Sequence, residues 1–237
     1  MTLLLLFVSV FPVILIGLYI YKKDKDKEPK SLLLGLFMSG FLSAMFVVII
    51  DAVISFVNPE FSTALEGNNL EFYKLFCTIF FEIALVEEFS KWLMIRFIGY
   101  NNKEFDELYD IIVYSVFVAL GFAMVENIFY VLPGGLSLGL FRALFSVPGH
   151  ASFGIFMGAF FGLAKIYEKK DKYLSNLYMI FAILVPTLLH TFYNFCLITG
   201  EAWFLLMFVV FIIALYISAI IYSDRISKDD KLLWYKW

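Results

Sequence analysis

The stretch ALVEEFSKWLMIRF, residues 84–97, decides how the rest of the chain is interpreted. It lies within a long apolar run typical of a membrane-spanning helix, yet it carries Glu87, Glu88 and Lys91. Each charged side chain at the centre of a spanning helix costs about 2.5–3.5 kcal/mol on insertion scales. Ionisable groups in such a position usually face the bundle interior or a water-filled cavity, so they indicate a functional site.

The composition around this stretch is that of a helical membrane protein. Of 237 residues, 62% are hydrophobic and 16% are charged, and the mean hydropathy is +0.87. So many apolar side chains cannot be covered in a soluble globule, but they suit helices in lipid. The sequence predicts one all-α integral-membrane domain, 1–237, in a multi-pass protein of the cell membrane. The net charge of −3, without a basic stripe, argues against a nucleic-acid partner.

Seven segments are long and apolar enough to cross a bilayer, which takes about 20 residues. They are 2–21, 31–57, 72–98, 109–131, 139–166, 175–198 and 202–222. A turn at Pro133-Gly134-Gly135 separates the fourth segment from the fifth. Most of the 18 basic residues fall in connections on one face, which predicts an external N-terminus and a cytoplasmic C-terminus. The loop at 58–70 is then external.

Polar residues also occur in the later predicted spans, and their spacing places them on helix faces. Glu87 and Glu88 precede Lys91 by four and three residues, so the lysine can pair with either carboxylate. Other polar residues occupy three further spans: Glu126 and Asn127, His150, and His190 with Asn194. His150, Gly154, Gly158 and Gly162 recur every four residues, and a stripe of small residues allows close helix contact.

Three other charged residues favour structural roles. Asp51 and Glu82 are predicted to be structural or interfacial, and Arg142 to anchor the external interface.

The polar set supports hydrolysis by two routes. Two neutral imidazoles and a carboxylate form a common zinc-binding set with an open position for water. The candidate metal ligands are His150, His190 and Glu126, and a second carboxylate would accept the proton of the water. Alternatively no metal is needed: a glutamate activates water, and the histidines and Asn194 polarise the scissile carbonyl.

Two other classes of function remain open at this point. Buried glutamate, histidine and lysine also suit a proton relay in a proton-coupled transporter or channel. The same polar groups could instead stabilise a non-catalytic membrane scaffold.

Four motifs on consecutive spans resemble one family. EEFSK (87–91) matches EExxK, FAMVEN (122–127) matches FxxxEN, PGH occupies 148–150, and HTFYN (190–194) matches HxxxN. In this order they resemble the PrsW family of intramembrane proteases, relatives of the CAAX prenyl endopeptidases and Abi proteins. The prenyl endopeptidases have FxxxH and EExxxR, whereas this chain has Glu126 in place of the histidine, and its basic residue, Lys91, comes one position earlier than the arginine. The resemblance covers about residues 70–198, the expected catalytic core.

The resemblance implies an activity, a substrate and site residues. A PrsW-type protein makes the first, extracytoplasmic cut in a membrane-bound anti-sigma factor, so the implied partner is a single-span membrane protein in the lipid bilayer. The implied cofactor is a divalent metal, zinc, or none if a glutamate activates water. The site residues carried over or grouped with the motifs are Glu87, Glu88, Lys91, Glu126, His150, His190 and Asn194.

Overall fold

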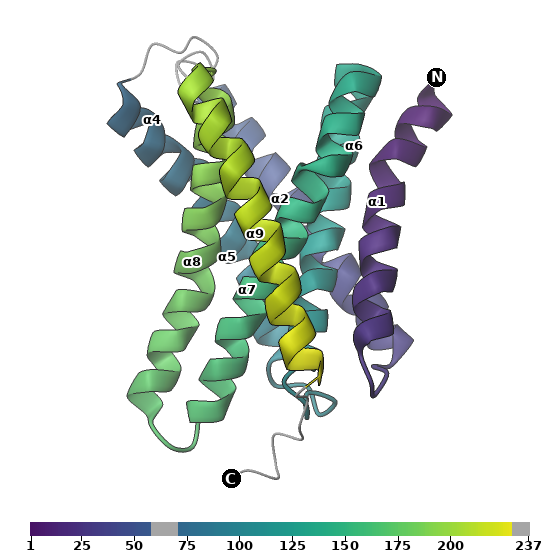
Figure 1. Cartoon of the computed structure of the whole chain (residues 1–237), viewed down its shortest axis with the longest axis vertical. Coiled ribbons are helices and arrows are strands. Elements are labelled where there is room, and N and C mark those ends of the chain that lie inside the picture. The colour runs from purple at the N-terminus through teal and green to yellow at the C-terminus, as the bar shows by residue number, and fades with distance from the viewer. Residues whose placement is uncertain (58–70, 229–237) are drawn as a thin grey trace.

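The structure, a computed structural model, describes residues 1–57 and 71–228, and these ranges are almost entirely helical (Figure 1). The long helices are α1 (Thr2–Lys23), α2 (Lys30–Val57), α6 (Asp110–Leu144), α7 (Ser146–Tyr167), α8 (Lys172–Ile198) and α9 (Ala202–Lys228). The predicted all-α class is confirmed. The predicted external loop at 58–70 lies outside the described residues.

The charged stretch lies on an irregular helical run between residues 72 and 99. The run begins with α4 (Phe72–Thr78) and passes through a π-helical segment, η1 (Ile79–Ala84). It continues as α5 (Leu85–Met94) and ends in a second π-helical segment, η2 (Ile95–Gly99). π-helical turns are rare and frequently mark functional sites. Here they flank the segment that carries Glu87, Glu88 and Lys91.

Several helices are long and apolar enough to cross a membrane. In the described part of the chain five stretches qualify: Thr2–Lys23, Lys30–Val53, Asp110–Tyr167, Lys172–Ile198 and Ala202–Lys228. The third of these has 58 residues and contains the fourth and fifth predicted spans. The protein is therefore a multi-pass membrane protein, while the count of seven spans and the external N-terminus stay predictions.

The chain reverses inside α6, at the predicted turn. Gly135 has φ of 79°, a left-handed conformation that glycine adopts without a steric penalty. Beyond it, Arg142 Nε donates a hydrogen bond to Asn127 Oδ1 at 2.8 Å. In a straight helix these residues would be about 22 Å apart. The turn at 133–135 is thus confirmed, and Phe145 marks the separate break between α6 and α7.

Helix α6 forms the centre of the bundle and packs against α1, α2 and α7. Its approach to α2 depends on a glycine from each helix. A Cβ added at Gly40 would overlap the carbonyl oxygen of Val118, and one added at Gly121 would overlap that of Phe37. The backbones of α2 and α6 therefore touch directly, as small residues permit in membrane bundles.

Alanine at either contact glycine is expected to destabilise the bundle. Gly40→Ala or Gly121→Ala would force the two backbones apart, and overpacking of this kind costs about 1–3 kcal/mol. The matched control is Gly35→Ala on α2, where an added Cβ meets nothing within 4 Å. Thermal unfolding in detergent should show lower melting temperatures for the first two variants only. Equal melting temperatures for all three variants would contradict the direct contact.

The lysine-rich connection after α1 is held against the end of α9. Lys23 pairs with Asp224, and Ser227 Oγ donates to the carbonyl oxygen of Lys23 at 2.7 Å. Lys25 Nζ donates to the carbonyl oxygen of Lys228 at 2.9 Å. The connection from α7 to α8 lies at the same end, opposite the start of α1 (Figure 1). This agrees with the one-sided placement of basic residues that the sequence predicts.

Two buried carboxylates in this connection make stability depend on pH. Burial raises the pKa of Glu28 from 4.5 to about 7 and that of Asp24 to about 6. A raised carboxylate pKa means that the folded state binds more protons than the unfolded state between the two values. The contribution of Glu28 is thus complete below about pH 4.5 and lost as the pH rises through about 7. Melting temperatures should fall over this range, and less steeply in Glu28→Gln; parallel profiles would contradict the prediction.

Candidate active site

Four helices bring the predicted polar residues together. Glu87 and Glu88 come from α5, His150 from α7 and His190 from α8, and each offers a ligand atom within 4.8 Å of the others. All four residues are buried. Glu126 on α6 joins the group through His150. The cluster lies inside a membrane bundle.

Lys91 lies among these groups and compensates their charge. Its ammonium is 2.7 Å from Glu88 Oε1 and 3.6 Å from Glu87 Oε2, the pairing that the helical spacing predicts. It is also 3.1 Å from His150 Nδ1 and 4.1 Å from the centre of the Phe122 ring. Only 1% of Lys91 is exposed. A buried ion pair is tolerated only when further hydrogen bonds satisfy it, and Lys91 has them.

The two glutamates of α5 differ in their burial and in their hydrogen-bond partners. Glu88 is fully buried, and its Oε1 accepts from Lys91 and from His190 Nδ1, at 3.0 Å for the latter. Glu87 is 8% exposed, lies 3.9 Å from His190 Nδ1, and its Oε2 has no hydrogen-bond partner in the ranges described. Glu88 is thus held by its neighbours, whereas Glu87 is free to interact with water or substrate.

The two histidines present different nitrogens. His190 Nδ1 donates to Glu88, which leaves Nε2 with a lone pair and no hydrogen-bond partner among residues 1–57 and 71–228. A carboxylate on one ring nitrogen commonly orients a histidine that binds metal through the other. His150 has both nitrogens engaged, Nδ1 by Lys91 and Nε2 by Glu126 Oε2 at 2.7 Å.

Arg142 is a member of this site that the sequence reasoning assigned elsewhere. Instead of anchoring an interface, its guanidinium lies 2.9 Å from Glu126 Oε1 and its side chain is 11% exposed. Arg142 also holds Asn127, whose Nδ2 donates to the carbonyl oxygen of Ser9 on α1. The signal was available, because Asn127 and Arg142 lie at nearly equal distances along the chain on the two sides of the predicted turn.

Asn194 stands apart from the cluster. It lies one turn after His190 on α8, is partly exposed, and makes no hydrogen bond to another described residue. The predicted role of Asn194, polarising the scissile carbonyl together with the histidines, stays a prediction.

The glycine stripe of α7 holds His150 against α6. A Cβ at Gly154 would lie 3.0 Å from the carbonyl oxygen of Ser115, and one at Gly158 would lie 2.8 Å from that of Ile111. This close packing confirms the predicted face and brings His150 to Glu126.

The donor set fits a divalent metal ion. Two imidazoles and two carboxylates converge, and the buried Oε2 atoms of Glu87 and Glu88 lack hydrogen-bond partners in the described ranges. Unpaired buried carboxylate oxygens are costly unless a cation or donor joins them. His150 Nδ1 becomes available only when Lys91 withdraws. The predicted ligand Glu126 is outside this group of four, since it pairs with Arg142 and His150.

Comparisons with known proteins identify the family. Residues 28–220 match the model of the PrsW family intramembrane metalloproteases. Protease PrsW of Oceanobacillus iheyensis is 38% identical over 221 residues, covering 93% of this chain and 95% of the relative. The Bacillus subtilis Protease PrsW is 33% identical, covering 82% and 84% respectively. No solved structure gives a significant match. The chain therefore belongs to the PrsW family of intramembrane metalloproteases.

Proposed function

We propose that this protease cleaves a membrane protein with a single spanning segment, as the first cut in regulated proteolysis of an anti-sigma factor. The observation that carries the proposal is the buried cluster of Glu87, Glu88, His150 and His190 inside the bundle. A substrate that meets this cluster must itself enter the membrane region. Family membership favours this activity over the transporter and scaffold hypotheses.

Glu87 is the proposed base. Its Oε2 accepts a proton from water as the water oxygen bonds to the carbonyl carbon of the scissile peptide. The proton then passes to the amide nitrogen as the C–N bond breaks, leaving a carboxylic acid and an amine. Glu88 positions His190, and Lys91 keeps Glu88 in place.

A divalent metal, which we propose is zinc, would be held by His190 and, once Lys91 withdraws from its Nδ1, by His150. When bound, such an ion polarises the scissile carbonyl and activates water. Without the metal, Lys91 is the cation that pairs with both Glu87 and Glu88.

Metal content provides a direct check on this assignment. The purified wild-type protein is expected to hold about one zinc ion per chain, because structural and catalytic zinc sites bind tightly. His190→Ala removes the free Nε2 donor and should lose most of the metal under the same dialysis. Glu82→Gln, an exposed change on η1, is the control and should retain it. Elemental analysis that finds equal zinc in all three, or none in the wild type, would contradict the zinc assignment.

The substrate can be identified by comparing protein termini in membranes. Wild type and Glu87→Gln are expressed at equal levels in a host that lacks the chromosomal copy, and new termini are mapped by mass spectrometry. The expected result is a terminus in, or just outside, the spanning segment of a single-span protein, present only with wild type. Termini confined to multi-span or soluble proteins would refute the proposed substrate class.

A further inference from the structure

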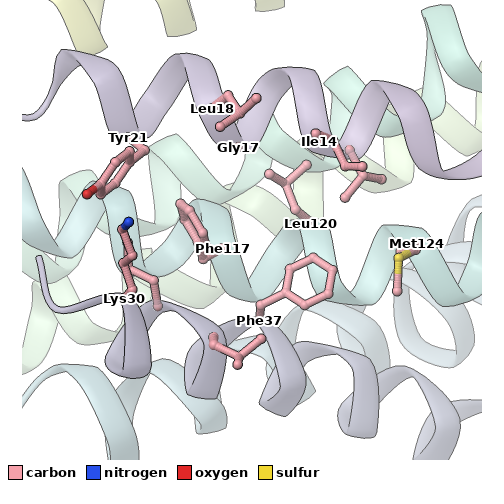
Figure 2. Close-up of a pocket in the computed structure, with 12 residues that line it drawn as sticks. Ile14, Gly17, Leu18, Tyr21, Lys30, Phe37, Phe117, Leu120 and Met124 are labelled. Atoms are coloured by element: carbon pink, nitrogen blue, oxygen red, sulfur yellow. The ribbon is translucent and has the colours of Figure 1, made fainter.

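A cavity lies between α1, α2 and α6, away from the active site. Its volume is about 370 Å³, and its walls are almost entirely apolar (Figure 2). Phe37 of α2 and Leu120 of α6 border it, and Gly17 of α1 leaves room for it because it has no side chain. In a water-soluble protein such a cavity would be a packing defect, but in a membrane bundle a hydrocarbon chain can fill it.

The cavity opens sideways to the surrounding lipid. Three of its lining residues, Ile14, Leu18 and Leu34, are 52%, 49% and 62% exposed. They lie on the outer faces of α1 and α2, where acyl chains surround the protein. An acyl chain can therefore enter from the bilayer without any rearrangement of the helices.

One end of the cavity is polar and positively charged. Figure 2 shows Tyr21 and Lys30 at this end of the cavity, with apolar side chains extending away toward Met124. Lys30 is exposed and forms no ion pair with another described residue, whereas Lys23 pairs with Asp224. Lys27 adds a second positive charge, 5.2 Å from the centre of the Tyr21 ring.

The backbone reinforces this charge. Lys30 is the first residue of α2, and the first N–H groups of a helix lack partners within the helix. A helix N-terminus, a lysine and a hydroxyl together suit a phosphate group. An anion site followed by a long apolar cavity matches the charged phosphate and the acyl chain of a phospholipid.

We propose that this cavity binds one anionic glycerophospholipid, with its phosphate at Tyr21 and Lys30 and one acyl chain between α1, α2 and α6. The site is separate from the active site. Met124, at its far end, and Glu126 are two residues apart on α6 and therefore point to opposite faces of that helix.

Native mass spectrometry of delipidated protein in a neutral detergent tests the proposal. The probes are phosphatidylglycerol and phosphatidylcholine at equal concentration. The wild type should retain one phosphatidylglycerol and at least about tenfold less phosphatidylcholine, since each basic residue near an anionic lipid adds appreciably to binding. Inorganic phosphate in excess should not displace the lipid. Displacement would instead indicate a free-anion site, and equal retention of both lipids a purely apolar one, and either result overturns the proposal.

Two pairs of variants locate the bound lipid. Gly17→Leu fills the cavity, and an added Cβ there fits, with Leu120 Cδ1 at 3.6 Å. Its control is Gly35→Leu, since Gly35 does not line the cavity and an added Cβ there meets nothing within 4 Å. Lys30→Glu reverses the charge at the polar end of the cavity. Its control is Lys22→Glu, which makes the same change at an exposed lysine that does not line the cavity.

Gly17→Leu and Lys30→Glu should each retain about tenfold less phosphatidylglycerol than the wild type. Their controls should retain as much as the wild type. Equal loss in Lys30→Glu and Lys22→Glu would show only general attraction to anionic lipid and would overturn the site. Retention in Gly17→Leu would place the lipid elsewhere. Thermal unfolding of each variant identifies any loss caused by misfolding, and cleavage activity serves as a separate readout, so failure here leaves the protease assignment intact.

Discussion

Replacement of Glu87 by glutamine is expected to lower the rate of peptide-bond cleavage by a factor of about 10²–10⁴, the usual contribution of a general base. The amide has nearly the same shape as the carboxylate but cannot accept the proton of the attacking water. The bundle should remain folded, because Glu87 Oε2 has no hydrogen-bond partner in the described ranges and lies 3.6 Å from Lys91. The measurement is cleavage of a single-span substrate in liposomes.

Glu82→Gln is the matched control for this variant. Glu82 lies five residues earlier in the same helical run, and its side chain is exposed instead of facing the cluster. The same chemical change there should leave the cleavage rate within about twofold of wild type, as expected of surface substitutions. If Glu87→Gln cleaves as fast as Glu82→Gln, Glu87 is not the base, and Glu88 becomes the next residue to examine.

Replacement of Lys91 by methionine is expected to destabilise the protein by about 3–5 kcal/mol, the cost of removing one partner from a buried ion pair. Methionine fills a similar volume, so the loss is mainly electrostatic. Glu87 and Glu88 would be left close together without the ammonium that lies 3.6 Å and 2.7 Å from them. Cleavage should be lost as well, because Lys91 also holds Glu88, which in turn positions His190.

A second substitution separates charge from packing. Adding Glu88→Gln to Lys91→Met removes one of the uncompensated carboxylates and should recover much of the lost stability without restoring cleavage. The control is Lys74→Met on α4, where the lysine is 54% exposed and pairs with Glu71 at 3.5 Å. Exposed pairs contribute about 0–1 kcal/mol, so this variant should unfold almost like wild type. Equal unfolding free energies for Lys91→Met and Lys74→Met would show that the buried ammonium contributes little to stability.

Features that depend on spacing along one helix were predictable from the sequence. Glu87, Glu88 and Lys91 pair because residues three and four apart share a helix face, whatever surrounds them. The all-α class follows from the long apolar runs, since such runs satisfy their backbone groups in lipid by forming helices. The reversal at Gly135 follows from a local Pro-Gly-Gly sequence. These properties are set by covalent geometry and by the solvent, so they require no knowledge of neighbouring helices.

Features that depend on contacts between helices were decided by the tertiary structure alone. Helical spacing lets Lys91 pair with either Glu87 or Glu88, and only the packing of α8 commits Glu88 to His190 and leaves Glu87 free. Likewise, Arg142 joins the site because the reversed part of α6 returns it to Glu126. A shift of one helix by a few ångströms would exchange these partners without changing a residue. Hydrogen bonds act over about 3 Å, so the choice of partners belongs to helix packing, which spacing along a single helix does not specify.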